Sequence, residues 1–295
     1  MIYPAFSLMP FFGIIQVTGS DRASFLHNQF SNDINHLEKG QACLATYNTA
    51  KGRVIANLVL LNRGEDLLII AARDLCSTII KKLQMYILRS KVTLTLQTDI
   101  SVAVATPSQS NSYQWPAQPI LKFSAQQIHE NWLIPLPDQS YLQIGKTENL
   151  PTFDSDLCRL WQQHEIQIGH PWISQSTTET CVAQMLNQQL IGAINFKKGC
   201  YPGQEIIARA QYRGQVKRGL ALLKTTESLQ DGELIYNQEN EEVGLIINQV
   251  RLNEETLALA VIKHTAATEK LHSQLNQNLT VEHCFFSCQD DTIDK

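Results

Sequence analysis

The sequence predicts an α+β fold that ends in a small β-barrel, and three observations lead to this prediction. The chain has 295 residues, which is more than one hydrophobic core usually holds, so we expect two or three domains. Strand-like and helix-like periodicities alternate up to Gly214. Beyond it, short strands with turn signals at Asp231-Gly232 and Asn253 indicate a barrel that begins near Gln215.

Apolar periodicity predicts the elements of the first part in turn. We expect strands over residues 12–17, 43–47, 53–62, 67–72 and 92–96. Ser20 can cap a helix that carries Phe25, and Asp74 can cap a second helix that begins with Leu75. Trp161 belongs to a third predicted helix.

The stretch at 197–209, Lys-Lys-Gly-Cys-Tyr-Pro-Gly-Gln-Glu-Ile-Ile-Ala-Arg, is the most informative part of the sequence. Cys200 lies between two glycines, and Pro202 keeps the following helix from extending back through the turn. That helix starts at Gln204 and can end in a left-handed cap at Gly214. Two lysines and a helix N-terminus favour the thiolate of Cys200 over the thiol, which indicates an anion or nucleophile site. The alternative is an ordinary turn in which the cysteine fills a small apolar gap.

The same string, Lys198-Gly-Cys-Tyr-x-Gly-Gln-Glu205, resembles the motif of the YgfZ family of folate-binding proteins. These proteins are relatives of the aminomethyltransferase (T-protein) of the glycine cleavage system. Residues 13–33 resemble the opening strand and helix of the family, and residues 49–58 resemble its second block, a lysine-glycine turn that leads into a strand. The basic residues at 213–218 match the exit from the motif helix.

This resemblance implies a T-protein-like, three-domain cloverleaf around a central folate channel, with the small β-barrel at the C-terminus. Residues 1–214 would form the folate-binding region from two interleaved α+β lobes, the second at roughly 46–150, and residues 215–295 the barrel domain. The implied cofactor is tetrahydrofolate or a one-carbon derivative. No metal ligand set is predicted, because the histidine and cysteines near residue 284 fit a strand.

The resemblance also implies site residues. Cys200 would be the functional thiol, with Lys198 beside it. A folate needs polar partners for its pterin edge, flat apolar walls for its rings and cations for its glutamate tail. The predicted folate contacts are Asn187, Tyr201, Gln204, Glu205, Lys51, Arg53 and Trp172.

Two positions depart from the pattern of the relatives. A Pro-x-Glu-x-Asn-Leu stretch often precedes the motif in the family, and here Asn187 is kept while Met185 takes the carboxylate position, so we expect weak folate affinity. Where aminomethyltransferases have paired aspartates, this chain has Ala56-Asn57. An amide cannot act as the charged partner or base, so glycine-cleavage aminomethyltransferase activity is not expected.

Two functions follow from the resemblance. The first is a folate-binding factor for the assembly or repair of iron–sulfur proteins, including tRNA-modifying enzymes; the alternative is a tetrahydrofolate-dependent one-carbon transferase or tRNA-modifying enzyme. A net charge of −4 predicts no direct DNA binding. Seven scattered cysteines indicate reduced thiols, and no secretory signal or membrane-spanning stretch is evident, so we expect the cytoplasm and no membrane partner.

Overall fold

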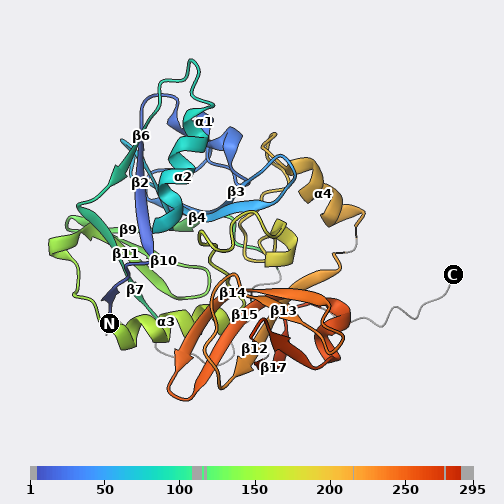
Figure 1. The fold of residues 1–295 in the computed structure, drawn as a ribbon. Coiled ribbons are helices and arrows are strands. Elements are labelled where there is room, and N and C mark those ends of the chain that lie inside the picture. The colour runs from blue at the N-terminus through green and yellow to red at the C-terminus, as the bar shows by residue number, and fades with distance from the viewer. Residues whose placement is uncertain (1–4, 108–114, 116–117, 215, 276, 287–295) are drawn as a thin grey trace.

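Three β-sheets organise the chain (Figure 1). The computed structural model describes residues 5–107, 115, 118–214, 216–275 and 277–286. A six-stranded sheet and a five-stranded sheet lie in the N-terminal part, and a closed six-stranded barrel follows. The predicted α+β fold with a C-terminal barrel is confirmed. Among the described residues, no helix is long and apolar enough to cross a membrane.

The six-stranded sheet is antiparallel and contains every strand predicted for the first part. In spatial order its strands are β6 (Thr93–Gln97), β2 (Phe12–Thr18), β5 (Leu67–Ala72), β4 (Val54–Asn62), β3 (Gln41–Asn48) and β8 (Phe123–Ser124). Its middle strands read as nearly continuous apolar runs because both faces are covered. Ile15 and Ile69 face the core shared with the helices α1 (Arg22–Gln29) and α2 (Arg73–Gln84), whereas Ile14 and Ile70 face the second sheet.

The second sheet has five strands, in the order β1 (Ser7–Leu8), β7 (Ile100–Ala105), β11 (Tyr141–Lys146), β10 (Asn131–Pro135) and β9 (Gln126–Ile128). The short 3-10 helix η1 (Thr147–Asn149) follows it. Helix α3 (Ser155–Gln167) then begins at Asp154, whose side chain accepts hydrogen bonds from Asp156 N and Leu157 N at 2.9 and 3.1 Å. Trp161 on α3 is the predicted marker of this helix, and it is buried against Phe12.

Helix α4 (Gln204–Tyr212) connects this part to the barrel, after the 3-10 helix η2 (Ala183–Leu186). In spatial order, the barrel strands are β12 (Arg218–Thr225), β15 (Glu255–Lys263), β14 (Glu242–Leu252), β13 (Leu234–Tyr236), β16 (Leu271–Ser273) and β17 (Asn278–Cys284). The 3-10 helix η3 (His264–Thr268) connects β15 to β16. Small and branched residues such as Ala221, Ala258 and Ile246 fill its interior. The predicted start at Gln215 lies outside the described residues, and the first barrel strand begins three residues later.

Three predicted caps are wrong. Helix α1 is preceded by Asp21, and Ser20 donates its hydroxyl to that side chain and does not cap the helix. Asp74 lies in the first turn of α2, where its carboxylate accepts the backbone N–H of Gln175 instead of capping. Helix α4 ends at Tyr212 with Arg213 as its C-cap, and Gly214 has no positive φ, so it does not form a left-handed cap. Ser20 lies one residue before the N-cap, and the carboxylate of Asp74 accepts a bond from outside the helix.

A close backbone contact joins the β3–β4 hairpin turn to the start of α4. Gly203, the N-cap of α4, has φ +79°, and a Cβ built there would lie 2.5 Å from the Thr49 carbonyl oxygen. Gly52 in the hairpin turn has φ +71°, and its Cα would lie 2.8 Å from the same Cβ. Only glycine adopts this conformation without strain and also leaves room for the neighbouring chain.

We therefore expect Gly203→Ala to lower the free energy of unfolding by about 2 kcal/mol or more, through backbone strain and the clash with Thr49. Gly199→Ala is the matched control, because its Cβ would meet nothing closer than His27 Nε2 at 3.7 Å. Urea unfolding followed by circular dichroism measures both variants. Equal stability of the two would contradict the close contact.

Candidate functional site

Cys200 lies on an exposed turn that leads into α4, as the sequence predicts. Among the six cysteines that the structure describes, it is the one with an exposed thiol; Cys43, Cys76, Cys158 and Cys181 are buried and Cys284 is half-buried. Burial raises the pKa of Cys43 to about 12 and that of Cys76 to about 11. The buried thiols are therefore kept in the unreactive form, and Cys200 is left for contact with a partner.

Lys198 connects the motif turn to the end of helix α1. Its Nζ donates hydrogen bonds to the carbonyl oxygens of His27 and Phe30, the second at 2.8 Å, and lies 4.7 Å from the ring centre of Tyr201. A cation at a helix C-terminus is stabilised by the helix dipole. Burial lowers the pKa of Lys198 to about 8, while the charges of Asp33 and Cys200 act in the opposite sense. The ammonium is thus charged at pH 7 and loses its proton as the pH rises through 8.

The other predicted residues of the motif surround the start of α4. Tyr201 is buried beneath Lys198, and burial raises its pKa. Gln204 is half-buried in the first turn, and Glu205 is exposed there, where a carboxylate suits the helix dipole. Lys51 is exposed on the hairpin turn that packs against this end of the helix. The structure therefore brings the two predicted motif blocks together.

Arg53 lies at the base of that hairpin, and its guanidinium forms hydrogen bonds with backbone carbonyl groups. It donates to the carbonyl oxygens of Glu179 and Thr180, so the side chain ties the hairpin to the segment before η2. Asn187, just after η2, is buried with φ +53° and donates its amide to the Phe285 carbonyl oxygen at 3.5 Å. Both predicted folate residues thus have structural partners in the chain itself.

Asn57 makes two backbone hydrogen bonds that need both the donor and the acceptor of an amide. Its Nδ2 donates to the Pro171 carbonyl oxygen at 2.6 Å, and its Oδ1 accepts the Ile173 N–H at 2.8 Å. The side chain is buried, and a carboxylate could not donate the first of these bonds. Asn57 therefore holds the 171–173 segment against β4.

Trp172 lies in the middle of this segment and lines a cleft. Helix α3 supplies Trp161 and Glu165 to the cleft, and the barrel supplies Asn248. Asn248 Oδ1 accepts Trp172 N–H at 2.7 Å, and its Nδ2 donates to the Trp172 carbonyl oxygen at 2.8 Å, which fixes this loop to β14. Figure 1 shows α3 and α4 well apart, so Trp172 does not join the predicted residues around α4.

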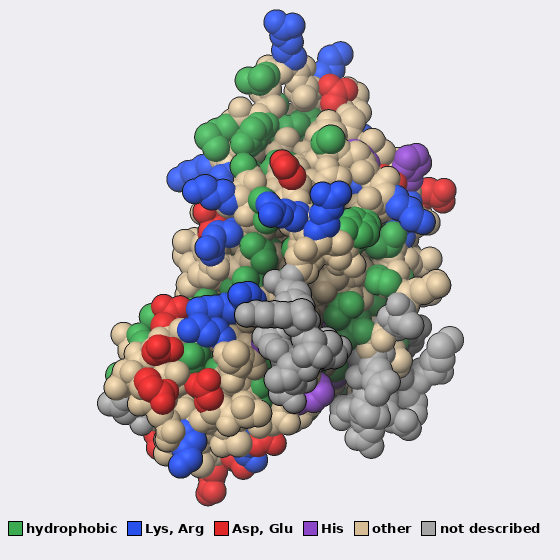
Figure 2. Space-filling model, turned by 90° about the vertical axis from the view of Figure 1, so that its right-hand side faces the viewer, with side chains coloured by type: hydrophobic (Ala, Val, Ile, Leu, Met, Phe, Trp, Pro, Cys, Tyr) green, Lys and Arg blue, Asp and Glu red, His purple; other side chains and the backbone are tan. Residues whose placement is uncertain are grey.

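Cations gather around α4. Lys197, Arg209, Arg213 and Lys217 are exposed, whereas Arg218 is half-buried and lies 3.6 Å from Glu242. In Figure 2, lysine and arginine side chains occupy the middle and upper parts of the face, and acidic side chains gather over the barrel below. This distribution leaves a locally positive surface beside the Cys200 turn on a chain whose net charge is −4.

The comparisons with known proteins agree with this geometry. No family model matches the chain. The chain is 29% identical over 277 residues to tRNA-modifying protein YgfZ of Yersinia pseudotuberculosis, covering 88% of this chain and 84% of the relative. It is also 29% identical over 268 residues to tRNA-modifying protein YgfZ of Photorhabdus laumondii, covering 85% and 81%. The resemblance to YgfZ proteins is confirmed.

The fold is also that of the aminomethyltransferases. The structure of glycine cleavage system aminomethyltransferase T from Bartonella henselae superposes with a TM-score of 0.68 at 10% sequence identity, covering 94% of this chain and 84% of the other. The predicted T-protein-like fold is thereby confirmed. At this identity the likeness concerns the fold alone.

Four cleft residues were not predicted as site residues from the sequence: Asp231, Asn248, Glu165 and His170. Asp231 was predicted only as part of a turn. The cleft is assembled from segments far apart in the sequence, so no local spacing marks it. The one available signal was the position of Glu165, four residues after Trp161 and therefore on the apolar face of the helix.

Proposed function

We propose that this chain is a YgfZ-type folate-binding protein that supports the assembly or repair of iron–sulfur proteins, including tRNA-modifying enzymes, with Cys200 as its functional thiol. The exposure of this one thiol on a glycine-lined turn carries the proposal. The thiolate form of cysteine is both a metal ligand and a nucleophile, so a partner protein can meet it directly. Lys198, two residues before the cysteine, is charged at pH 7 and adds a cation to this turn.

Folate binding is assigned to the cleft beside α3. Trp161 and Trp172 pack against each other, with ring centres 5.9 Å apart, and together supply one flat apolar wall. Among the described residues, Trp161 Nε1 and Asp231 Oδ1 lack hydrogen-bond partners, so they offer one donor and one acceptor to a pterin edge. Burial raises the pKa of Asp231 to about 6, which leaves it mostly ionised at pH 7.

Lys51 and Glu205 stay predicted folate contacts, although they lie near α4. The exposed cations there also suit the anionic tail of a folate or an acidic partner surface. Free thiols at Cys43, Cys76, Cys158, Cys181 and Cys200 support a cytoplasmic location. The bonds of Asn57 to Pro171 and Ile173 support the expectation that the chain is not a glycine-cleavage aminomethyltransferase.

Calorimetry in buffer with EDTA tests the folate proposal. Tetrahydrofolate should bind weakly, and Trp172→Phe should weaken binding by about three- to tenfold because it shortens the apolar wall. Trp132→Phe in the five-stranded sheet is the control and should bind like the unaltered chain. Absence of binding at millimolar ligand would remove the folate proposal, and equal weakening in both variants would move the site out of the cleft.

A second prediction concerns the thiol. In a host that lacks its own YgfZ protein, Cys200→Ser should abolish the support of an iron–sulfur tRNA-modifying enzyme, while the variant keeps its fold and its folate affinity. Cys284→Ser, at the half-buried end of β17, serves as the control and should retain support. The cluster content of the purified target enzyme is the measurement. Full cluster content with Cys200→Ser would mean that the cysteine only packs the turn.

A further inference from the structure

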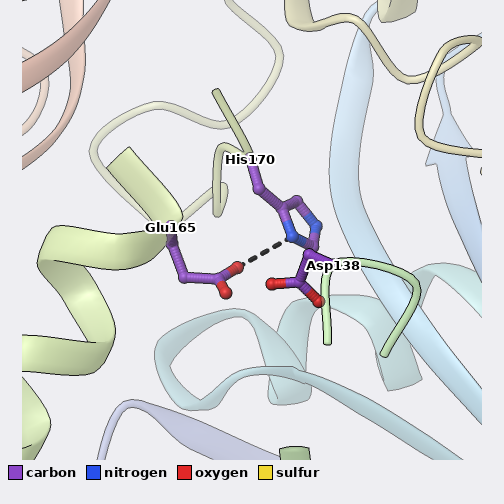
Figure 3. A group of neighbouring side chains, drawn as sticks. All are labelled: Asp138, Glu165 and His170. Carbon is purple, nitrogen blue, oxygen red and sulfur yellow. Dashed lines mark ion pairs between the residues drawn. The ribbon is translucent and has the colours of Figure 1, made fainter. Parts of the chain in front are cut away.

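A buried group of two carboxylates and an imidazole lies at the inner side of the cleft. Asp138 is on the β10–β11 turn, Glu165 is near the end of α3, and His170 is on the loop that follows. All three are at most 2% exposed, and one ligand atom from each lies within 4.8 Å of the others. Figure 3 shows the two carboxylates converging on one edge of the imidazole ring.

His170 is under-satisfied in this group. Its Nδ1 lies 2.8 Å from Glu165 Oε2, yet outside hydrogen-bond geometry, and neither ring nitrogen has a hydrogen-bond partner among the described residues. A side chain that is 1% exposed normally has its polar atoms paired. Two carboxylates and the Nδ1 of His170 lie around one point, and oxygen and nitrogen atoms of these kinds are the ligands that a divalent metal ion requires.

We propose that Asp138, Glu165 and His170 bind a divalent transition-metal ion of the Zn²⁺ or Mn²⁺ class. With metal–ligand bonds of about 2.1 Å, two ligands of one ion lie at most about 4.2 Å apart. At tetrahedral angles the ligand atoms lie about 3.4 Å apart, so a pair 4.8 Å apart closes on an ion after a shift of about 1.4 Å, shared between two side chains. Two carboxylate oxygens with one imidazole nitrogen suit Zn²⁺ or Mn²⁺ better than Ca²⁺, which prefers an all-oxygen shell.

Surrounding residues orient the proposed ligands. His164 Nε2 lies 3.2 Å from Asp138 Oδ2, and the Ser140 hydroxyl donates to Asp138 Oδ1 at 3.0 Å. Trp172 Nε1 donates to Glu165 Oε2 at 2.8 Å. Such outer partners fix ligand orientation in metal sites. Glu165 and His170 also line the cleft, so an ion there would keep coordination positions open towards it.

Titration with the metal alone tests this site, independently of the folate proposal because no folate is added. After EDTA dialysis and removal of the chelator, ZnCl₂ and MnCl₂ are added separately in a calorimeter. We expect one ion per chain, and at least about tenfold weaker binding in His170→Ala and Glu165→Gln. His36→Ala, which removes an exposed imidazole 2.8 Å from Asp33, is the control and should leave the affinity unchanged.

If a variant does not fold, the visible spectrum of the unaltered chain with Co²⁺ bound tests the proposal instead. Co²⁺ should give the visible spectrum of oxygen and nitrogen ligands without a thiolate charge-transfer band. Any one of three results would overturn the proposal: no stoichiometric binding of the metal, a thiolate band in the cobalt spectrum, or an unchanged metal affinity in a folded His170→Ala variant. The group would then be a charge network that holds α3 to the β10–β11 turn. If His36→Ala weakened metal binding as much as His170→Ala does, the ion would lie on the surface, and the proposal would be overturned as well.

Discussion

The close approach of two backbones, at Gly52 and Gly203, is the constraint on which the rest of the site depends. The hairpin turn of the first sheet meets the N-cap of α4 at a distance that no side chain can enter. This contact fixes where α4 begins and therefore where the preceding turn holds Cys200. Lys198 adds a second attachment, because its ammonium bonds to the last carbonyls of α1. The exposed thiol is thus presented by a turn that is held rigidly from two sides.

Buried polar contacts have a similar role where the three sheets meet. Asn57 ties the loop after α3 to the six-stranded sheet, and Asn248 ties the same loop to the barrel. Each amide both donates and accepts, which neither an apolar residue nor a carboxylate can do in its place. The aromatic cleft and the Asp138–Glu165–His170 group lie beside this junction. Their geometry therefore depends on how the sheets are joined more than on any single element.

The sequence predicted the strands of the first sheet because long apolar runs and turn residues reflect local constraints. It also predicted the barrel and the exposed Cys200 turn, since glycine and proline restrict or permit particular backbone conformations at their own positions. The caps at Ser20 and Asp74 were wrong because Asp21 takes the N-cap position of α1 and because the Asp74 carboxylate accepts the N–H of a distant residue, Gln175. The cleft and the buried ionisable group could not be predicted, because Asp138 and His170 meet only after three chain segments have packed.

Competitive alkylation of the folded chain tests the central claim most directly. Iodoacetamide at pH 7, followed by mass mapping, should label Cys200 first and faster than an unstructured cysteine peptide, while Cys43 and Cys76 stay unlabelled. Lys198→Met should slow the labelling of Cys200, and Lys197→Met, which removes an exposed cation, should have a smaller effect. Labelling of Cys200 no faster than that of the peptide would contradict an activated thiol on this turn.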